Sequence, residues 1–143
     1  MDQVQLLFSR TNSIESYAVR MMSWSRWSHV ALVHGDAIVE AVPGVGVRRT
    51  SFVEAIRDVS DARIVSLPGI DEERIFELMC SQIGKPYDWG AVFGIALHRD
   101  WQNDEKWFCS ELIAWAFAKA GDPLFREEVI HRITPEHLWM VTK

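Results

Sequence analysis

Apolar positions recur with two different periods along the chain, and each period predicts one kind of secondary structure. Short apolar runs predict strands at 4–8, at 63–67 and on both sides of Gly35-Asp36. Helical spacing covers 71–84 and the stretch from Cys109 to about Gly121. Helices and strands alternate irregularly, which favours an α+β fold over a doubly wound parallel sheet.

Capping residues add further helices to this pattern. Polar caps predict helices over about 12–23 and 51–59, and a proline at the first position predicts a last short helix after 134. The stretch 91–97 is apolar but contains Gly94, so helix and loop both stay open there. Pro43-Gly44-Val45-Gly46-Val47 is interpreted as a turn after a strand, too short for a dinucleotide-binding loop. The capping signals are Asn12 with Glu15, Ser51 with Glu54, Asp71, and Thr134-Pro135-Glu136.

Cys109 lies where a polar loop turns into an apolar helix. The run Trp101-Gln102-Asn103-Asp104-Glu105 offers caps and first-turn carboxylates for this helix. Near a helix N-terminus, unpaired backbone N–H groups and the helix dipole favour a thiolate over a thiol. This segment alone fits an activated thiolate and a small apolar core residue equally well.

The hairpin around Gly35-Asp36 supplies a candidate partner for this thiol. A two-residue loop sets a register in which His29 pairs with Val42. His29 and Glu40 are then diagonal neighbours on one face, about 7 to 8 Å apart, within reach of a carboxylate–imidazole hydrogen bond. A three-residue loop would place them on opposite faces. Taken singly, each residue also fits a structural polar position in a sheet.

Four short motifs follow one another in a recognisable order. They are Ser28-His29, Val39-Glu40-Ala41, Gly84-Lys85-Pro86-Tyr87-Asp88-Trp89-Gly90 and Phe108-Cys109-Ser110-Glu111-Leu112. In their order and spacing the chain resembles the circularly permuted branch of the NlpC-like papain-fold hydrolases, in particular the YiiX-like proteins. In that branch the histidine strand precedes the cysteine helix, the reverse of papain. The resemblance extends from about Leu7 to Leu138.

The resemblance implies a permuted papain-like α+β fold, with an antiparallel sheet packed with helices, as a single domain over residues 1–143. It also implies that Cys109 is the nucleophile, that His29 is the base and that Glu40 orients the imidazole. Tyr87 matches the tyrosine of the family's G-x-P-Y segment, whose hydroxyl helps to bind the oxyanion, although it also fits an aromatic anchor beside a turn.

This set of residues predicts a cysteine hydrolase that cleaves an amide or ester bond through a thioester acyl-enzyme. Cell-wall peptide and acyl-modified small molecules are the leading substrates. Two positions, Phe108 and Glu111, differ from the Asp and Gly of many NlpC-like peptidases, so peptidoglycan does not follow from the resemblance. A thiol acyltransferase similar to lecithin retinol acyltransferase is one alternative, and a binding module without catalysis is the other.

Composition narrows the partners and cofactors. The net charge is −5, from 20 acidic and 15 basic residues with no basic stripe, so we expect no nucleic-acid partner. The five histidines and two cysteines show no metal-ligand spacing, and no phosphate loop is present, so we expect neither a metal nor another cofactor. Cys80 belongs to an apolar helical pattern, which predicts a core residue that forms no bridge with Cys109.

The chain is rich in tryptophan for its length. The seven tryptophans fit either an aromatic-walled cleft or packing in the core and at its rim; five of them flank the motifs, namely Trp24, Trp27, Trp89, Trp101 and Trp107. The N-terminus lacks a signal-peptide pattern, and no stretch approaches the roughly 20 apolar residues of a membrane span. We therefore expect a cytoplasmic protein without an integral membrane segment, with export by a phage-type lysis route left open. The oligomeric state is not predicted.

Overall fold

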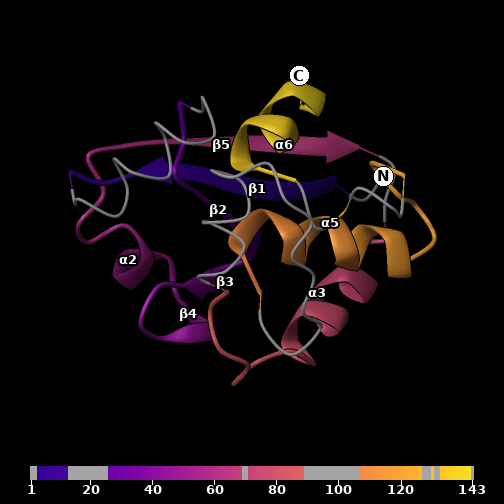
Figure 1. The fold of residues 1–143 in the computed structure, drawn as a ribbon, viewed down its shortest axis with the longest axis horizontal. Coiled ribbons are helices and arrows are strands. Elements are labelled where there is room, and N and C mark those ends of the chain that lie inside the picture. Colours follow the sequence, from indigo (N-terminus) through magenta and orange to yellow (C-terminus); the bar gives the residue numbers. More distant parts are fainter. Residues whose placement is uncertain are drawn as a thin grey trace.

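An antiparallel sheet of five strands, in the order β4-β3-β2-β1-β5, is the framework of the part of the chain that the structure describes (Figure 1). The structure is a computed structural model, and it describes residues 3–12, 26–68, 71–88, 107–126, 130 and 133–142. The strands are β1 (Gln3–Arg10), β2 (His29–His34), β3 (Ala37–Val42), β4 (Gly46–Ser51) and β5 (Asp61–Pro68). The helices are α2 (Phe52–Ala55), α3 (Glu72–Cys80), α5 (Cys109–Lys119) and α6 (Pro135–Val141).

Both faces of the sheet are covered, which explains the continuous burial in the middle of β1. On one face, alternate strand residues such as Leu6 and Phe8 join the main core with buried residues of α3, α5 and α6. On the other face, Leu7 belongs to a smaller cluster packed against residues of α2. The α+β class and the antiparallel sheet packed with helices are thus as predicted. None of the helices in the described segments is long and apolar enough to cross a bilayer.

The β2–β3 hairpin has the predicted register. His34 pairs with Ala37 across Gly35-Asp36, and Gly35 takes the positive φ of 60° that a tight hairpin turn requires. The ladder continues to Leu32 opposite Val39. The pairing of His29 with Val42, extrapolated from the turn, is not among the pairs of this ladder. The side chains of His29 and Glu40 nevertheless meet on one face of the sheet, as that register predicts.

Helix caps agree with the sequence more closely than helix lengths do. Ser51 accepts a hydrogen bond from the Glu54 N–H, and Asp71 accepts one from the Arg74 N–H. However, α2 ends at Ala55 and continues as turns, so the prediction of a helix to about Val59 is wrong. The predicted helix over about 12–23, apart from residue 12 itself, and the stretch 91–97 lie outside the described residues.

Strand β4 corrects the interpretation of residues 43–47 as only a turn. The turn ends at Val45, and from Gly46 the chain pairs with β3, with Val47 opposite Ala41. The buried side chain of Val47 explains the strand, since it completes the main core next to Ala41. The neighbouring Arg48 and Arg49 gave this segment too little apolar character for a strand prediction.

Gly46 brings β4 against the segment that leads to Tyr87. The Val47 N–H donates to the Lys85 carbonyl at 2.9 Å, and the Gly84 N–H donates to the Val47 carbonyl at 3.0 Å. Gly46 has a φ of 96°, and a Cβ at this position would lie 2.4 Å from the Lys85 oxygen. The close approach of these two backbones therefore requires glycine.

We predict that Gly46→Ala lowers the free energy of unfolding more than Gly44→Ala does. Gly44 also has a positive φ, 78°, but a Cβ there would meet nothing within 4 Å. Both changes place an alanine at a positive φ, which destabilises the folded state by about 1 kcal/mol. Gly46→Ala also forces its Cβ against the Lys85 backbone, which costs about 1 to 3 kcal/mol more. Urea unfolding of the two variants measures the difference. Equal losses would contradict the role of Gly46 in docking the 84–88 segment.

Candidate active site

Cys109 is the first residue of α5, and its side chain is only 1% exposed. The residue at the N-cap, Phe108, makes no capping hydrogen bond through its side chain. The thiol therefore lies at the positive end of the helix, where a negative charge is stabilised. The expectation that 101–105 provides the first-turn carboxylates is wrong, because α5 begins later and the acidic residue of its first turn is Glu111.

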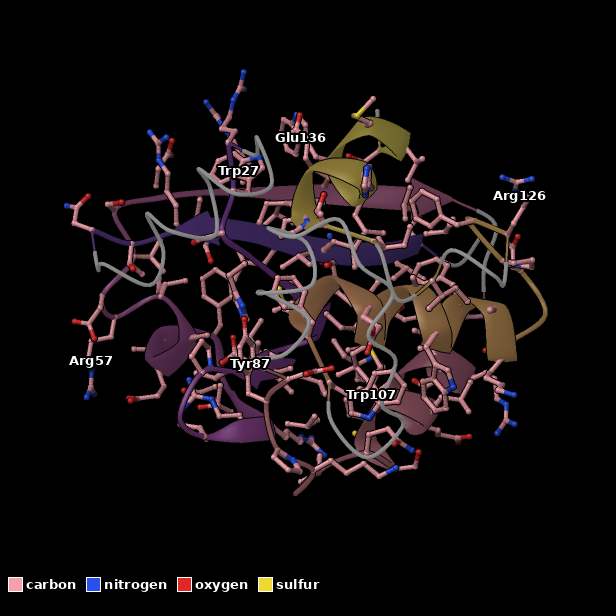
Figure 2. All side chains as sticks on the ribbon, viewed as in Figure 1. Trp27, Arg57, Tyr87, Trp107, Arg126 and Glu136 are labelled. Carbon is pink, nitrogen blue, oxygen red and sulfur yellow. The ribbon has the colours of Figure 1, made fainter. Side chains whose placement is uncertain are left out.

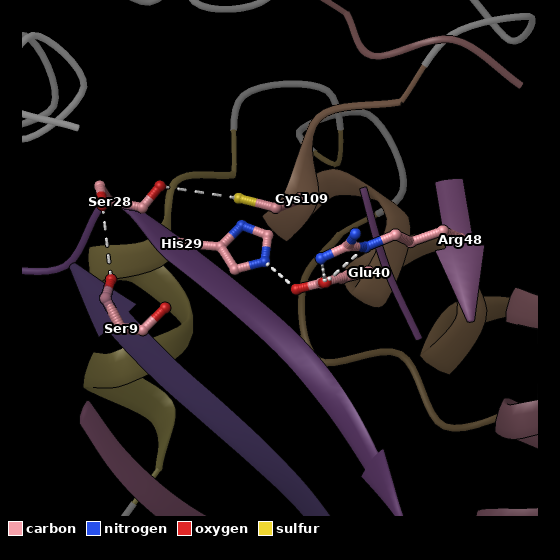
Figure 3. A network of polar contacts seen from close by, with 6 residues as sticks. All are labelled: Ser9, Ser28, His29, Glu40, Arg48 and Cys109. Atoms are coloured by element: carbon pink, nitrogen blue, oxygen red, sulfur yellow. Dashed lines mark hydrogen bonds and ion pairs between the residues drawn. The ribbon is translucent and has the colours of Figure 1, made fainter. Parts of the chain in front are cut away.

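His29 stands between Cys109 and Glu40 (Figure 3). It is the first residue of β2, and its Nε2 lies 2.8 Å from Glu40 Oε1. Its other ring nitrogen, Nδ1, points toward the sulfur of Cys109. The sulfur also lies 4.0 Å from the Ser28 carbonyl oxygen. The three residues that the sequence singled out for a triad thus meet at one end of the sheet.

The surroundings of His29 favour the imidazolium. Burial lowers the pKa of His29, but hydrogen bonds to Cys109 and Glu40, together with their negative charges, outweigh it and raise this pKa to about 10. The ring is therefore protonated at neutral pH.

Glu40 has a second partner, Arg48, which the sequence analysis missed. The Glu40 side chain is 4% exposed. Its Oε2 accepts a hydrogen bond from Arg48 Nε at 2.9 Å and also lies 2.9 Å from Arg48 Nη2 as an ion pair. Burial alone would raise the pKa of Glu40, but His29 and then Arg48 lower it below the ordinary value. Glu40 and Arg48 are direct partners in the β3–β4 ladder. Only the pairing of β4 with β3 could have identified this contact.

Tyr87 forms a β-bridge with Trp107, two residues before Cys109; Figure 2 labels both aromatic residues. The Trp107 N–H donates to the Pro86 carbonyl and the Asp88 N–H to the Trp107 carbonyl, both at 3.0 Å. The Tyr87 ring is 6% exposed and its centroid lies 5.8 Å from that of Phe108. Burial raises the pKa of Tyr87, and the charges of Cys109 and Asp88 raise it further. Its hydroxyl therefore stays protonated and can donate a hydrogen bond.

The described tryptophans near the motifs serve packing. Trp27 is buried against Phe8 and Trp139, and Trp107 is buried with its Nε1 donating to Gln82 at 3.0 Å. Trp24, Trp89 and Trp101 lie outside the described residues. Cys80 is half-buried at the rim of the main core, and both cysteines are free thiols.

In this structure the strand that carries His29 precedes the helix that carries Cys109, and His29 lies between a cysteine and a carboxylate. This is the arrangement of a permuted papain-like fold. Residues 4–137 match the family described as permuted papain-like amidase enzymes, YaeF/YiiX, the C92 peptidase family. This match spans most of the chain, so the protein belongs to this family.

Two relatives illustrate the similarity. The probable lipoprotein peptidase YaeF of Escherichia coli K12 is 28% identical over 153 residues, an alignment that covers 83% of this chain and 56% of YaeF. The chain thus spans only about half the length of this curated relative. The crystal structure of the metalloprotein YiiX from Escherichia coli O157:H7 shares the fold, with a TM-score of 0.63 and 19% identity over 83% of this chain and 66% of that one.

The name of YiiX describes it as a metalloprotein, and a metal ion needs several His, Cys, Asp or Glu donors grouped around it. Within the residues that the structure describes, no group of three or more His, Cys, Asp or Glu side chains is arranged to hold a metal ion. The donors at the site do not fit one either, since Glu40 is engaged by His29 and Arg48.

We predict that the His29 ring is still protonated at about pH 8 in the wild-type protein. Its ordinary pKa is 6.5, and the raised value of about 10 keeps the proton bound until the pH approaches that range. Glu40→Gln and Cys109→Ala should each lower the pKa of His29, because each removes a negative partner. Titration of the ring nitrogens by NMR measures all three proteins. A His29 pKa near 6.5 in the wild type would contradict the ion-paired site.

Proposed function

We propose that the protein hydrolyses an amide or ester bond through a thioester on Cys109, with His29 as the acid and base, Glu40 orienting the imidazole and Tyr87 helping to bind the oxyanion. The single observation that carries the proposal is the position of His29, whose two ring nitrogens face the sulfur and the Glu40 carboxylate. Membership of the permuted papain-like amidase family supports it.

The first half of the reaction forms the acyl-enzyme. The Cys109 thiolate attacks the carbonyl carbon, and the carbonyl electron pair moves onto oxygen. When the tetrahedral intermediate collapses, the bond to the leaving group breaks, and the His29 imidazolium gives its Nδ1 proton to the departing amine or alcohol. The products are the free leaving group, a thioester on Cys109 and a neutral His29.

The second half releases the acid and restores the enzyme. Neutral His29 takes a proton from water as the water oxygen attacks the thioester carbonyl. The second intermediate expels the Cys109 thiolate, which is again paired with an imidazolium. Throughout, the Nε2–H bond to Glu40 holds the ring so that Nδ1 keeps facing the sulfur.

Each intermediate carries a negative oxygen that needs donors. The backbone N–H of Cys109 belongs to the first turn of α5, where N–H groups lack partners within the helix. The protonated hydroxyl of Tyr87 is the proposed second donor, and losing one such donor typically costs about 3 to 4 kcal/mol of transition-state stabilisation.

The substrate class is proposed from the family. An amidase-type site fits peptide or other amide bonds, and the name of YaeF, a probable lipoprotein peptidase, favours a peptide substrate. Esters of small acyl groups present the same reacting carbonyl, so we include them among the proposed substrates. Acyl transfer to an acceptor other than water would begin with the same formation of a thioester on Cys109.

We predict that an activated acyl ester is turned over in a reaction that requires Cys109. Intact mass spectrometry after incubation should show transient addition of one acyl group, lost within the turnover time. Cys109→Ala should abolish the adduct, whereas Cys80→Ser should keep it, since Cys80 lies outside the site. His29→Ala should slow formation of the adduct because the thiolate loses its imidazolium partner.

Two other outcomes of this measurement separate the alternatives. An adduct that persists in water but disappears when an amine or alcohol acceptor is added would favour acyl transfer over hydrolysis. No adduct on Cys109 with any activated ester would contradict the catalytic proposal and favour a binding module.

A further inference from the structure

The Glu40 carboxylate is shared between two strands. Its Oε1 lies 2.8 Å from His29 Nε2 on β2, whereas its Oε2 lies 2.9 Å from both Nε and Nη2 of Arg48 on β4 (Figure 3). Each oxygen therefore has its own partner. The planar guanidinium thus occupies one oxygen of the carboxylate and leaves Oε1 for the imidazole.

The Arg48–Glu40 pair differs from an ordinary surface ion pair. Glu40 is 4% exposed and Arg48 32% exposed, so the carboxylate is shielded while the guanidinium is partly solvated. A charge in such a position is costly unless it is paired and hydrogen-bonded. Without Arg48, the imidazole alone would have to keep the buried carboxylate ionised and oriented.

The charges around Glu40 give Arg48 a second effect. The ionisable groups that contact the carboxylate in the described chain are His29 from β2 and Arg48 from β4, and Cys109 of α5 lies beyond the His29 ring. A nearby cation makes the carboxylate a weaker base. Arg48 therefore keeps Glu40 ionised in mild acid and disfavours transfer of the Nε2 proton from the imidazolium to Glu40.

We propose that Arg48 is a positioning residue of the active site, which holds the Glu40 carboxylate ionised and turned toward His29. This inference rests on the proposed function of Cys109 and His29. It extends the triad by one residue, into a chain from the guanidinium through the carboxylate and imidazole to the thiolate.

The experiment compares Arg48→Gln with Arg49→Gln. Arg49 is the next residue of β4, its side chain is exposed, and its guanidinium lies 5.1 Å from the centre of the Phe76 ring. Both variants lose one positive charge from the same strand, but only Arg48→Gln loses the contact with Glu40. The pH profile of kcat/KM for an activated acyl ester is measured for each, and the Glu40 carboxyl carbon is titrated by NMR.

We expect Arg48→Gln to move the acid limb of kcat/KM to higher pH by about one unit, which is about a tenfold loss at a pH on that limb. The Glu40 titration should move in the same direction, because the carboxylate has lost a cation. Arg49→Gln should change neither curve. Adding Arg48→Gln to Glu40→Gln should shift the acid limb no further, since Arg48 acts through the carboxylate.

Several results would overturn the positioning role. They are an acid limb that is unchanged in Arg48→Gln, an equal shift in Arg49→Gln, or a further shift in the double variant.

If Arg48→Gln fails to fold, Arg48→Lys keeps the charge but not the planar fork, and should lower kcat/KM without moving the acid limb. Wild-type kcat/KM for that variant would contradict the proposal. Wild-type protein without Cys109-dependent turnover would instead reject the proposed function, and the Glu40 titration would still test the contact with Arg48.

Discussion

The hydrogen bond between His29 and Glu40 is the contact on which the rest of the site depends. It joins β2 to β3 at 2.8 Å through side chains, and it leaves Nδ1 of the ring for the sulfur of Cys109. The two-residue turn at Gly35-Asp36 makes this contact possible, because a slip of one residue would turn His29 and Glu40 to opposite faces. A local choice of turn thus determines whether the imidazole can be oriented at all.

The remaining residues of the site are brought in from the edge of the sheet. β4 pairs with β3 and places Arg48 opposite Glu40, while its start at Gly46 holds the segment that leads to Tyr87. The bridge between Tyr87 and Trp107 then fixes the chain just before the cysteine helix. Tertiary contacts of the backbone, rather than a capping side chain, therefore define where α5 begins and where the thiol lies.

The features that depend on local turn and capping chemistry could be predicted from the sequence, whereas those that depend on tertiary contacts could not. The hairpin register followed from local turn chemistry, and the helix caps at Ser51 and Asp71 from short-range hydrogen bonding. β4 and Arg48 had no such local signal, because two adjacent arginines after a glycine-rich turn resemble a loop. Their roles depend on pairing with β3, which neither hydrophobic period nor capping pattern encodes. The start of α5 was also misplaced, because the bridge between Tyr87 and Trp107 precedes it and no side chain caps the helix.

If His29 activates Cys109 as the reactive thiol of the site, the two cysteines of this chain should differ in reactivity. The rate of alkylation by iodoacetamide as a function of pH measures this difference, with the two cysteines distinguished by peptide mass spectrometry. We expect Cys109 to react well below about pH 8, where an ordinary thiol is mostly protonated, and much faster than Cys80. Equal alkylation of the two cysteines at neutral pH would contradict it.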